Sequence, residues 1–395
     1  MNICFFLISG GWGGAENAVY NLAKFMKKKG HKINIVLNEE TYLFFKGLEG
    51  INLVNVGPVF FYSKILKNNF GVSLPQFPFD YEIFRKTSRF FLGSLLKQLN
   101  YIKIRRNILE TIDTINPDFI HFHNPVVLEF CSHIFHHLKY PIIYTAHGLD
   151  FENNNSIDKL KDLKKRRLLM KFDKITAVSE YAKEHLILNR VKSDIDVIYN
   201  GIDLELFDNI LTNKQETNDD KEEFKLIFAG GQKRQKGGEI LLKALKKINN
   251  EKYKIKLFYC GYTNNQFRKN HCDTNVVFKG LIPQCEYLTL LSKCDCFILL
   301  SKSEGFNISI LEAMALGKTV ITTPVRGIPK LFDNGVNGFL VQRNSKDVAD
   351  KIIYIYKNPG LRKQIWKRNL QDAKKFDWNN IIDHYIDLYK AMAST

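Results

Sequence analysis

The chain of 395 residues has 45% hydrophobic and 25% charged residues, a composition typical of a folded globular protein and not of a disordered or fibrous one. A single hydrophobic core stops growing at roughly 250–300 residues, so this length predicts two domains. The formal net charge of +17 favours anionic partners. Both halves of the chain are basic, however, and the sequence contains no nucleic-acid-binding module, so we expect no nucleic acid as partner.

The apolar run from Ile3 to Ile8 has no basic segment before it and is too short for a signal peptide, so it predicts a buried strand. No run of roughly 18 uncharged apolar residues occurs, which argues against a membrane-spanning helix. The seven cysteines are odd in number and include no C-x2-C pair, which favours reduced thiols over disulfides or a zinc site. These features predict a cytoplasmic protein.

Short apolar runs alternate with helical patterns through the first half of the chain. The helical pattern of residues 17–29 stands between the first two runs, and the predicted strands are residues 3–8, 33–37, 119–122, 142–145, 174–178 and 196–199. Neighbouring parallel strands need a crossover helix, so this alternation predicts βαβ units and a parallel sheet.

The second half repeats the same scheme. Its predicted strands are residues 225–229, 254–259, 276–279, 296–300 and 319–322. The polar stretch before them, residues 211–223, has no periodicity and indicates a surface loop or linker. The sequence thus predicts two Rossmann-like domains, residues 1–202 and 224–377, joined by residues 203–223. Ligands of doubly wound sheets bind outside the carboxyl ends of the strands, so we expect a binding cleft between the domains.

The segment "ISGGWGGAENA" places four glycines between a strand and a helix. It fails as a dinucleotide fingerprint because Glu16 stands where the third glycine is needed, and no Gly-Lys-Ser/Thr follows to make a Walker loop. Glycines before a helix allow backbone N–H groups to approach an anion. By itself this segment fits either a phosphate-facing loop or a simple turn.

The segment "SKSEGFNISILEAMALGK" carries two glutamates, Glu304 and Glu312, on either side of a predicted helix start. Asn307 is a good N-cap, which places Glu304 just before the helix and Glu312 about a turn and a half into it. An anion at the N–H groups of residues 307–309 would have a carboxylate on each side. That arrangement suits a nucleotide sugar, because carboxylates accept hydrogen bonds from paired hydroxyls.

This segment resembles the donor-binding signature of the retaining glycosyltransferases of family 4. Further segments resemble that family in the same order along the chain: "GGAENAVYNLA", "FIHFHNP", "YTAHGLD", "TAVSEYAKEHL", "VIYNGID", "FAGGQKRQKGGEILLKAL" and "FDWNNIIDHYIDLY". The resemblance implies the GT-B fold, α/β with two facing Rossmann-like doubly wound domains and a cleft between them. It also implies a terminal helix, about residues 378–395, that crosses back onto the first domain.

The resemblance further implies which residues contact the donor. Catalytic roles fall to Glu304 at the sugar hydroxyls, Lys236 at the leaving diphosphate and His147 facing the sugar from the first domain. Glu312 would hold the ribose. The full donor-binding set comprises Gly13, Gly14, Gly231, Arg234, Lys236, Glu304, Phe306, Asn307, Ile308, Ser309 and Glu312. On the acceptor side we expect Trp12, His123 and Asn124.

The sequence departs from the family pattern at the phosphate clamp. An arginine usually stands five positions before the lysine, and here that position is Gly231, so Lys233 or Arg234 would have to supply the second cation. We find no Asp-x-Asp in a suitable loop, since Asp194 and Asp196 flank a predicted strand edge. With Lys236 and a helix end neutralising the diphosphate, no metal or other cofactor is expected.

The resemblance implies a metal-independent, retaining hexosyl- or N-acetylhexosaminyltransferase of bacterial cell-surface polysaccharide synthesis. Its donor is a nucleoside diphosphate sugar, UDP-sugar before GDP-sugar, and its acceptor a glycan or a lipid-linked glycan. The basic and aromatic stretch of residues 60–106, together with residues 159–174, suits an anionic membrane surface or a solvated helix face. An inactive nucleotide-sugar-binding assembly protein and a sugar-nucleotide epimerase remain alternatives.

Overall fold

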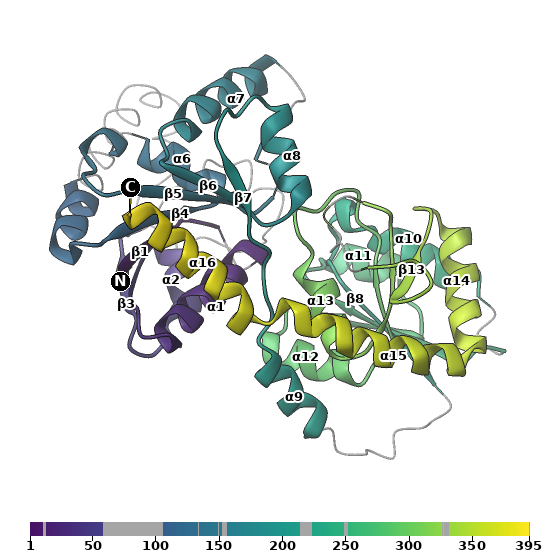
Figure 1. Ribbon diagram of the computed structural model, residues 1–395. Coiled ribbons are helices and arrows are strands. Elements are labelled where there is room, and N and C mark those ends of the chain that lie inside the picture. The colour runs from purple at the N-terminus through teal and green to yellow at the C-terminus, as the bar shows by residue number, and fades with distance from the viewer. Residues whose placement is uncertain are drawn as a thin grey trace, which may run out of the picture.

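The computed structural model describes residues 1–10, 13–57, 106–132, 134–148, 150–151, 156–213, 223–248, 252–325, 327 and 332–394. Two parallel sheets, each flanked by helices, lie side by side, and the last two helices run along both halves (Figure 1). Both chain ends lie on the side of the first sheet (Figure 1). The predicted pair of doubly wound sheets is confirmed.

The first sheet has seven parallel strands in the order β3-β2-β1-β4-β5-β6-β7. The strands are β1 (Asn2–Leu7), β2 (Lys32–Leu37), β3 (Asn52–Asn55), β4 (Phe119–His123), β5 (Ile142–Ala146), β6 (Lys174–Ala177) and β7 (Ile195–Val197). The helices include α1 (Gly14–Lys28), α2 (Glu39–Phe45), α6 (Pro125–Cys131), η1 (Phe135–His137), α7 (Ser156–Leu169) and α8 (Glu180–Leu188), and residues 106–115 are also helical. All six strands predicted for this half are confirmed.

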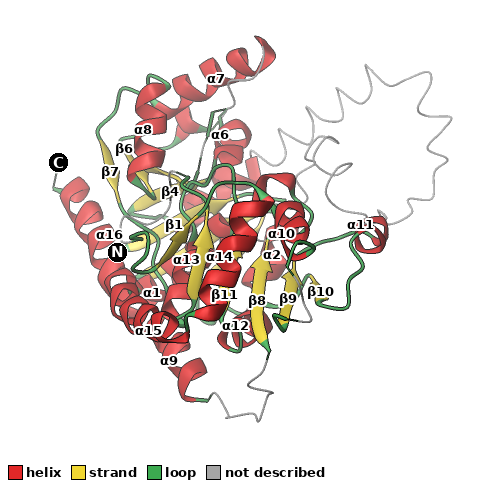
Figure 2. Cartoon of the chain, turned by 90° about the vertical axis from the view of Figure 1, so that its right-hand side faces the viewer, coloured by secondary structure: helices red, strands yellow, loops and turns green. Residues whose placement is uncertain are grey.

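The second sheet has six parallel strands in the order β10-β9-β8-β11-β12-β13. Figure 2 shows β10, β9, β8 and β11 of this sheet side by side. The strands are β8 (Phe224–Ala229), β9 (Ile255–Cys260), β10 (Val276–Gly280), β11 (Cys296–Leu299), β12 (Thr319–Thr322) and β13 (Gly338–Leu340). Among the described residues, the helices of this half are α9 (Leu204–Thr212), η2 (Arg234–Lys236), α10 (Gly238–Leu245), α11 (Asn265–Asn270), α12 (Gln284–Ser292), α13 (Ile308–Ala315), α14 (Ser345–Lys357), α15 (Pro359–Ala373) and η3 (Lys374–Phe376). The terminal helix α16 (Trp378–Ala393) lies against the first half. All five strands predicted here are confirmed.

Strand β1 shows why the predicted strands read as unbroken apolar runs. Ile3, Phe5 and Leu7 pack into one hydrophobic cluster with α1 and α16, whereas Cys4 and Phe6 pack into another with α6 and α8. A strand buried on both faces needs apolar residues at every position, which is the pattern of a parallel sheet covered by helices on both sides.

The chain crosses between the two halves twice, and the two crossings pair with each other. Ile202 donates its N–H to the carbonyl oxygen of Phe376 at 2.8 Å, and Trp378 donates to the carbonyl oxygen of Ile202 at 3.0 Å. Helix α16 then packs on α1 of the first half, while Phe207 of α9 belongs to the core of the second.

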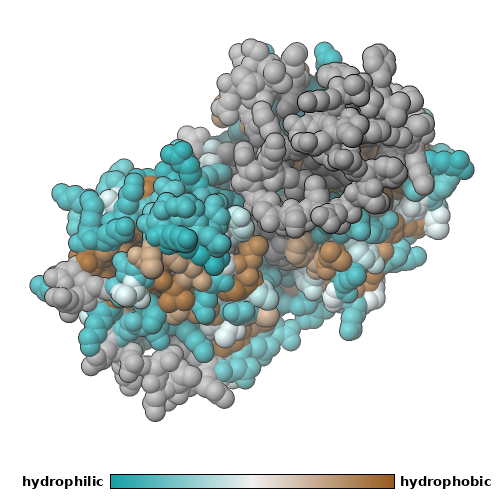
Figure 3. Space-filling view, turned by 180° about the vertical axis from the view of Figure 1, so that it is seen from behind, coloured by the Kyte–Doolittle hydropathy of each residue, from teal (hydrophilic) through white to brown (hydrophobic). Residues whose placement is uncertain are grey.

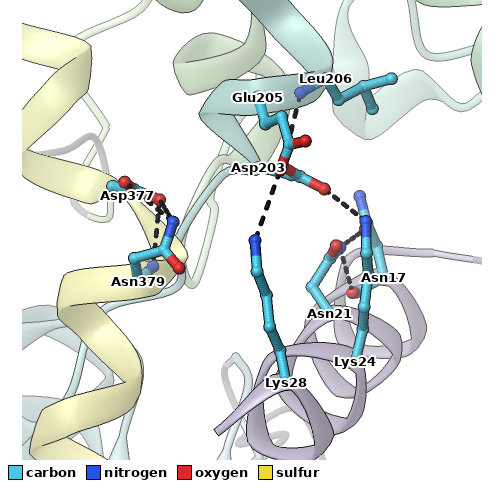
Figure 4. Close-up of polar contacts among 9 residues, drawn as sticks. All are labelled: Asn17, Asn21, Lys24, Lys28, Asp203, Glu205, Leu206, Asp377 and Asn379. Carbon is cyan, nitrogen blue, oxygen red and sulfur yellow. Dashed lines mark hydrogen bonds and ion pairs between the residues drawn. The ribbon is translucent and has the colours of Figure 1, made fainter.

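Ion pairs bridge the halves beside these crossings. Lys24 and Lys28 of α1 reach the start of α9, where their Nζ atoms lie 2.6 Å from Asp203 and 3.4 Å from Glu205 (Figure 4). Asp203 also caps α9, accepting a hydrogen bond from the N–H of Leu206 (Figure 4). Backbone pairing and the Lys24–Asp203 contact, with its buried carboxylate, thus join the halves, whereas the exposed Lys28–Glu205 pair contributes little.

On the face seen from behind, hydrophilic residues lie around the periphery and apolar residues gather between them (Figure 3). Among the exposed large apolar side chains are Leu188 and Leu281, with 73% and 70% of their surface accessible. Within the part of the chain that the structure describes, no helix is both long and apolar enough to cross a membrane. All seven cysteines are free thiols.

Candidate active site

The centre of the site is an ion pair between two loops of the second half. Lys236, at the end of η2, places its Nζ 2.6 Å from Oε1 of Glu304, in the loop that follows β11. The Ser301 hydroxyl donates to the same oxygen. Only 12% of the Glu304 side chain and 28% of the Lys236 side chain are exposed. The geometry brings together two of the three predicted catalytic residues.

The two loops are joined through their backbones as well. Leu300 donates its N–H to the Lys236 carbonyl oxygen at 3.2 Å, and Lys302 donates to the Gln235 carbonyl oxygen at 2.9 Å. Gly237 permits this approach: it has φ +77°, and a Cβ there would lie 2.4 Å from the Leu300 carbonyl oxygen. The ion pair is therefore held by the fold and not only by its own attraction.

Arg343, which we did not predict from the sequence, clamps the same loops. Its Nε donates to the Leu300 carbonyl oxygen at 2.8 Å, and its Nη2 donates to the Arg234 carbonyl oxygen at 2.6 Å. A guanidinium presents several donors in one rigid plane, so one side chain can fix two chain segments. Arg343 thereby ties the end of β11 to the turn that carries Lys236.

Gly231 shows why the family's arginine is absent. Its φ is +55°, and a Cβ there would lie 2.6 Å from the Tyr262 carbonyl oxygen, so this backbone excludes any side chain at the position. The Tyr259 hydroxyl donates to the Gly231 carbonyl oxygen at 2.7 Å and holds the turn. Lys233 and Arg234 are both exposed beside it.

Helix α13 begins as predicted. The side chain of Asn307 caps it, with Oδ1 accepting from the Ile310 N–H at 3.2 Å, and Ile308 and Ser309 form its first turn. Phe306, just before the cap, packs its ring between Tyr199 and Phe376 at the crossings. The side chain of Phe306 therefore anchors the loop, which leaves its backbone for the diphosphate contact that the resemblance implies.

Glu312 lies in a different environment from Glu304. It is 5% exposed within α13, and the amide of Gln284 donates to its Oε1 at 3.2 Å. Burial disfavours the charged carboxylate and raises its pKa from the usual 4.5 to about 7. Glu312 is thus held mainly neutral in the free protein below neutral pH.

The loop that carries Glu304 touches the first half at Gly305. A Cβ on Gly305 would lie 2.4 Å from Cα of Gly148 and 2.6 Å from the carbonyl oxygen of His147. The hydroxyl of Ser179 donates to the Gly305 carbonyl oxygen at 2.6 Å. This contact places the residue after Glu304 directly against the strand end that carries His147.

His147 is paired with His123 at the ends of adjacent strands. Nε2 of His147 and Nδ1 of His123 lie 3.0 Å apart, and the ring of His121 stacks on that of His123 at 4.2 Å between centroids. Burial lowers the pKa of His147 to about 3 and holds the pKa values of His121 and His123 well below the usual value of 6.5. All three imidazoles are therefore neutral.

Two further residues, Asn124 and Trp12, were predicted to bind the acceptor. Asn124 caps α6 by accepting from the N–H groups of Val126 and Val127, and its amide donates to the Ile8 carbonyl oxygen at 2.9 Å. Its polar atoms thus serve the fold. Trp12 lies outside the described residues.

The glycine segment begins α1, with Gly13 as the N-cap and Gly14 as the first helical residue. Buried Glu16 folds back beneath Gly13: a Cβ on that glycine would lie 3.0 Å from the carboxylate oxygen Oε2. The third position after an N-cap is where a glutamate completes a capping arrangement. This local structure explains why Glu16, and not a glycine, stands at this point.

No cluster of three or more metal-ligating side chains occurs among the described residues. Asp194 and Asp196, the nearest approach to an Asp-x-Asp pattern, flank the start of edge strand β7, where the ammonium of Lys174 contacts both carboxylates. Their pairing with a lysine supports the interpretation of this motif as a strand edge.

Comparison with known proteins agrees with this geometry. Residues 209–372 match the family model described as glycosyl transferases group 1, and residues 12–206 match that of glycosyltransferase family 4. An uncharacterized glycosyltransferase of Methanocaldococcus jannaschii is 30% identical over 305 residues, 75% of this chain and 80% of that protein. The chain belongs to glycosyltransferase family 4.

Other relatives of this glycosyltransferase have more specific names. The N-acetyl-alpha-D-glucosaminyl L-malate synthase of Bacillus anthracis is 27% identical over 95% of this chain and 93% of that protein. A shorter match, 35% over 26% of this chain and 28% of the relative, is to the N,N'-diacetylbacillosaminyl-diphospho-undecaprenol alpha-1,3-N-acetylgalactosaminyltransferase of Campylobacter jejuni.

The solved structure of Anabaena HepE in complex with UDP-glucose superimposes with a TM-score of 0.75 at 19% identity, covering 98% of this chain and 99% of that one. Together with the two parallel sheets, this likeness confirms the predicted GT-B fold.

Proposed function

We propose that the protein is a retaining hexosyl- or N-acetylhexosaminyltransferase that uses a nucleoside diphosphate sugar, UDP-sugar before GDP-sugar. The acceptor is a hydroxyl of a glycan or lipid-linked glycan of bacterial cell-surface polysaccharide synthesis, such as lipopolysaccharide, capsule or exopolysaccharide. The observation that carries the proposal is the Lys236–Glu304 ion pair on a loop that touches the backbone of His147.

The donor diphosphate lies between the second half's cations and the first turn of α13. Lys236 then exchanges part of its contact with Glu304 for the diphosphate, whose negative charge grows as the bond to the anomeric carbon breaks. A positioned cation in a site shielded from water stabilises such charge by about 3 kcal/mol. In this scheme the reaction needs no metal ion, because Lys236 and the start of α13 neutralise the leaving group.

Glu304 faces the sugar ring. Once Lys236 turns to the diphosphate, Glu304 accepts hydrogen bonds from sugar hydroxyls and stabilises the positive charge that develops at the anomeric carbon. The acceptor oxygen attacks the face from which the diphosphate leaves, and its proton passes to a diphosphate oxygen. One carbon–oxygen bond forms as another breaks, and the configuration at the anomeric carbon is retained.

The Bacillus anthracis relative is named for an N-acetylglucosaminyl product, the Campylobacter jejuni relative is named an N-acetylgalactosaminyltransferase, and the HepE complex holds UDP-glucose. These names support the choice of donors. The Campylobacter enzyme's name specifies a lipid diphosphate acceptor.

A membrane position for this protein is supported by α7, which exposes Leu163, Lys164 and Arg167. The stretch of residues 60–105 lies outside the described residues.

The proposed transfer is tested by a donor screen that measures free nucleoside diphosphate from uridine, guanosine and adenosine diphosphate sugars, with and without glycan acceptors. We expect release from UDP-sugars that rises with acceptor and is lost in Glu304→Ala. If no nucleoside diphosphate were released from any donor, the alternative of an inactive nucleotide-sugar-binding protein would be supported. Conversion of the donor sugar without acceptor would indicate an epimerase.

Retention is read from the anomeric proton coupling of the product. The peripheral membrane position, on the inner face of the cell membrane, is tested with vesicles of phosphatidylglycerol and phosphatidylcholine at low salt, using pure phosphatidylcholine vesicles as control. Sedimentation with the anionic vesicles alone is expected. If the protein failed to sediment with the anionic vesicles, the membrane position would be contradicted, but the proposed transfer reaction would not.

A further inference from the structure

The hydroxyl of Ser179 links the first half to the loop that carries Glu304. Ser179 precedes α8 and is buried, with 4% of its surface exposed. Its Oγ accepts a hydrogen bond from the N–H of Ala182 at 3.1 Å, and its hydroxyl donates to the carbonyl oxygen of Gly305 at 2.6 Å. An N–H can only donate and a carbonyl oxygen can only accept, so the single hydroxyl proton must point to Gly305. One side chain thus caps α8 and joins the two halves.

This bond differs in position from the other contacts between the halves described above. The paired backbone at Ile202 and the Lys24–Asp203 contact lie where the chain crosses between the halves. The Ser179 bond instead holds the peptide group that directly follows Glu304. It therefore bears on the position of that carboxylate, and not only on the general placement of the halves.

The backbone at Glu304 and Gly305 has neighbours on both sides. On the second half, a Cβ at Gly327 would overlap the carbonyl oxygen of Glu304 and lie 2.7 Å from that of Gly305. On the first half, Gly148 packs closely against Gly305. Glycines permit this approach but have no side chain to hold it. The hydroxyl of Ser179 provides a directed bond at this point.

We propose that Ser179 is a positioning residue of the transferase: its hydroxyl holds the peptide after Glu304 against the end of β5, so that Glu304 and His147 keep a fixed separation. The inference rests on the proposed function for its effect on turnover, whereas the hydrogen bond is a property of the free protein. Ser179 acts through the loop and does not bind the donor, because its hydroxyl proton is already bonded to Gly305.

Position matters here because the reacting groups come from different halves. Displacing a catalytic group by roughly 1 Å can lower turnover by about 10²-fold. A bond between a neutral hydroxyl and a peptide carbonyl fixes direction without adding charge beside the diphosphate. Loss of this bond should therefore slow the reaction and leave the binding of UDP by the second half nearly unchanged.

Two variants separate this bond from the cap of α8. Ser179→Asp keeps an oxygen that accepts from Ala182, but its carboxylate has no proton to donate at neutral pH. Ser179→Gly removes the hydroxyl without adding charge, and glycine at an N-cap costs little helix stability. The matched control is Asn344→Gly, which makes the same kind of change at the cap of α14, where Asn344 accepts from the N–H groups of Lys346 and Asp347.

We expect both Ser179 variants to lower kcat roughly tenfold, with the affinity for UDP unchanged in titration calorimetry. Asn344→Gly should change neither value. A loss of kcat in Ser179→Asp alone would show an effect of charge and overturn the inference, as would the natural kcat in both variants. A parallel loss of UDP affinity would also overturn it, because the variants would then disturb the donor site as a whole.

A second measurement does not depend on turnover. Hydrogen–deuterium exchange of the free protein, followed by mass spectrometry, reports on the backbone of residues 301–309. Exchange there should be faster in both Ser179 variants than in the natural protein and in Asn344→Gly. Equal exchange would overturn the inference even if no active donor is found, whereas absence of turnover in the natural protein with every donor would instead refute the proposed function.

Discussion

The two strand ends that meet at Gly305 are built from opposite kinds of chemistry. On the first sheet, His123 and His147 are neutral imidazoles whose pKa values are lowered by burial. On the second sheet, Lys236 and Glu304 are oppositely charged and face each other at 2.6 Å. Neutral donors can direct a sugar hydroxyl, and only charged groups can balance a diphosphate. We propose that the two halves share the donor: His147 of the first half contacts only the sugar, whereas the second half contacts the diphosphate through Lys236 and the sugar through Glu304.

The largest loss of activity is expected when the carboxylate of Glu304 is removed. In Glu304→Ala we expect kcat to fall by about 10²–10³-fold, because the carboxylate that stabilises the developing positive charge is lost. The measurement is initial-rate release of nucleoside diphosphate from the best donor. Glu205→Ala, which removes a carboxylate that is 74% exposed on α9, is the matched control and should keep its rate. An unchanged rate in Glu304→Ala would refute the site.

The second test removes the cation and leaves its partner. Lys236→Met should lower kcat by about 10²-fold and also weaken UDP binding, because the diphosphate loses its counter-charge in the ground state as well. Lys236→Arg should recover part of both. Titration calorimetry with UDP separates binding from turnover. Full affinity for UDP in Lys236→Met would show that another cation, such as Arg234, holds the phosphate.

A third variant acts on the contact between the halves. Gly305→Ala places a methyl group 2.4 Å from Cα of Gly148, which a backbone cannot absorb without moving apart. We expect roughly a tenfold loss of kcat with little change in UDP affinity, because the sugar-facing groups separate and the phosphate site does not. Gly360→Ala, at an open position on α15, is the control. Equal turnover in both variants would mean that this contact is not needed for reaction.

The smallest effect concerns Glu312, which lies on the charged half but is buried like the histidines. Its pKa is raised from 4.5 to about 7, so the folded state binds its proton more tightly than the unfolded state does. This group therefore lowers stability as pH rises from about 4.5 to about 7. The Tm difference between Glu312→Gln and the natural protein should shift in favour of the variant across that range. If the Tm of Glu312→Gln fell relative to that of the natural protein as the pH rises, the burial argument would be contradicted.

Every central strand was predicted from the sequence, whereas only half of the edge strands were. The strands in the middle of each sheet are unbroken apolar runs because helices cover both faces, as in β1. The edge strands β7 and β10 were predicted, and the opposite edge strands β3 and β13 were missed. Strand β3 has only two apolar residues between asparagines, and β13 has only two after a glycine, so neither shows a strand pattern in the sequence.

Site residues also differ in whether a sequence pattern reveals them. Glu304, Lys236 and the Asn307 cap lie in short motifs and were predicted. The His123–His147 contact left a signal, because the parallel register pairs His123 with Thr145 and puts His147 just beyond the end of its strand. Arg343 left none. Its guanidinium binds carbonyl oxygens of residues far away in the chain, and such contacts have no motif.

The most direct test of the division between the halves compares the binding of UDP with that of UDP-glucose, or of the best UDP-sugar from the screen, by titration calorimetry. The account predicts that Lys236→Met weakens both ligands alike, whereas His147→Ala weakens only the ligand that carries the sugar. If His147→Ala weakens UDP as much as the UDP-sugar, the first half binds phosphate too, and the account is contradicted.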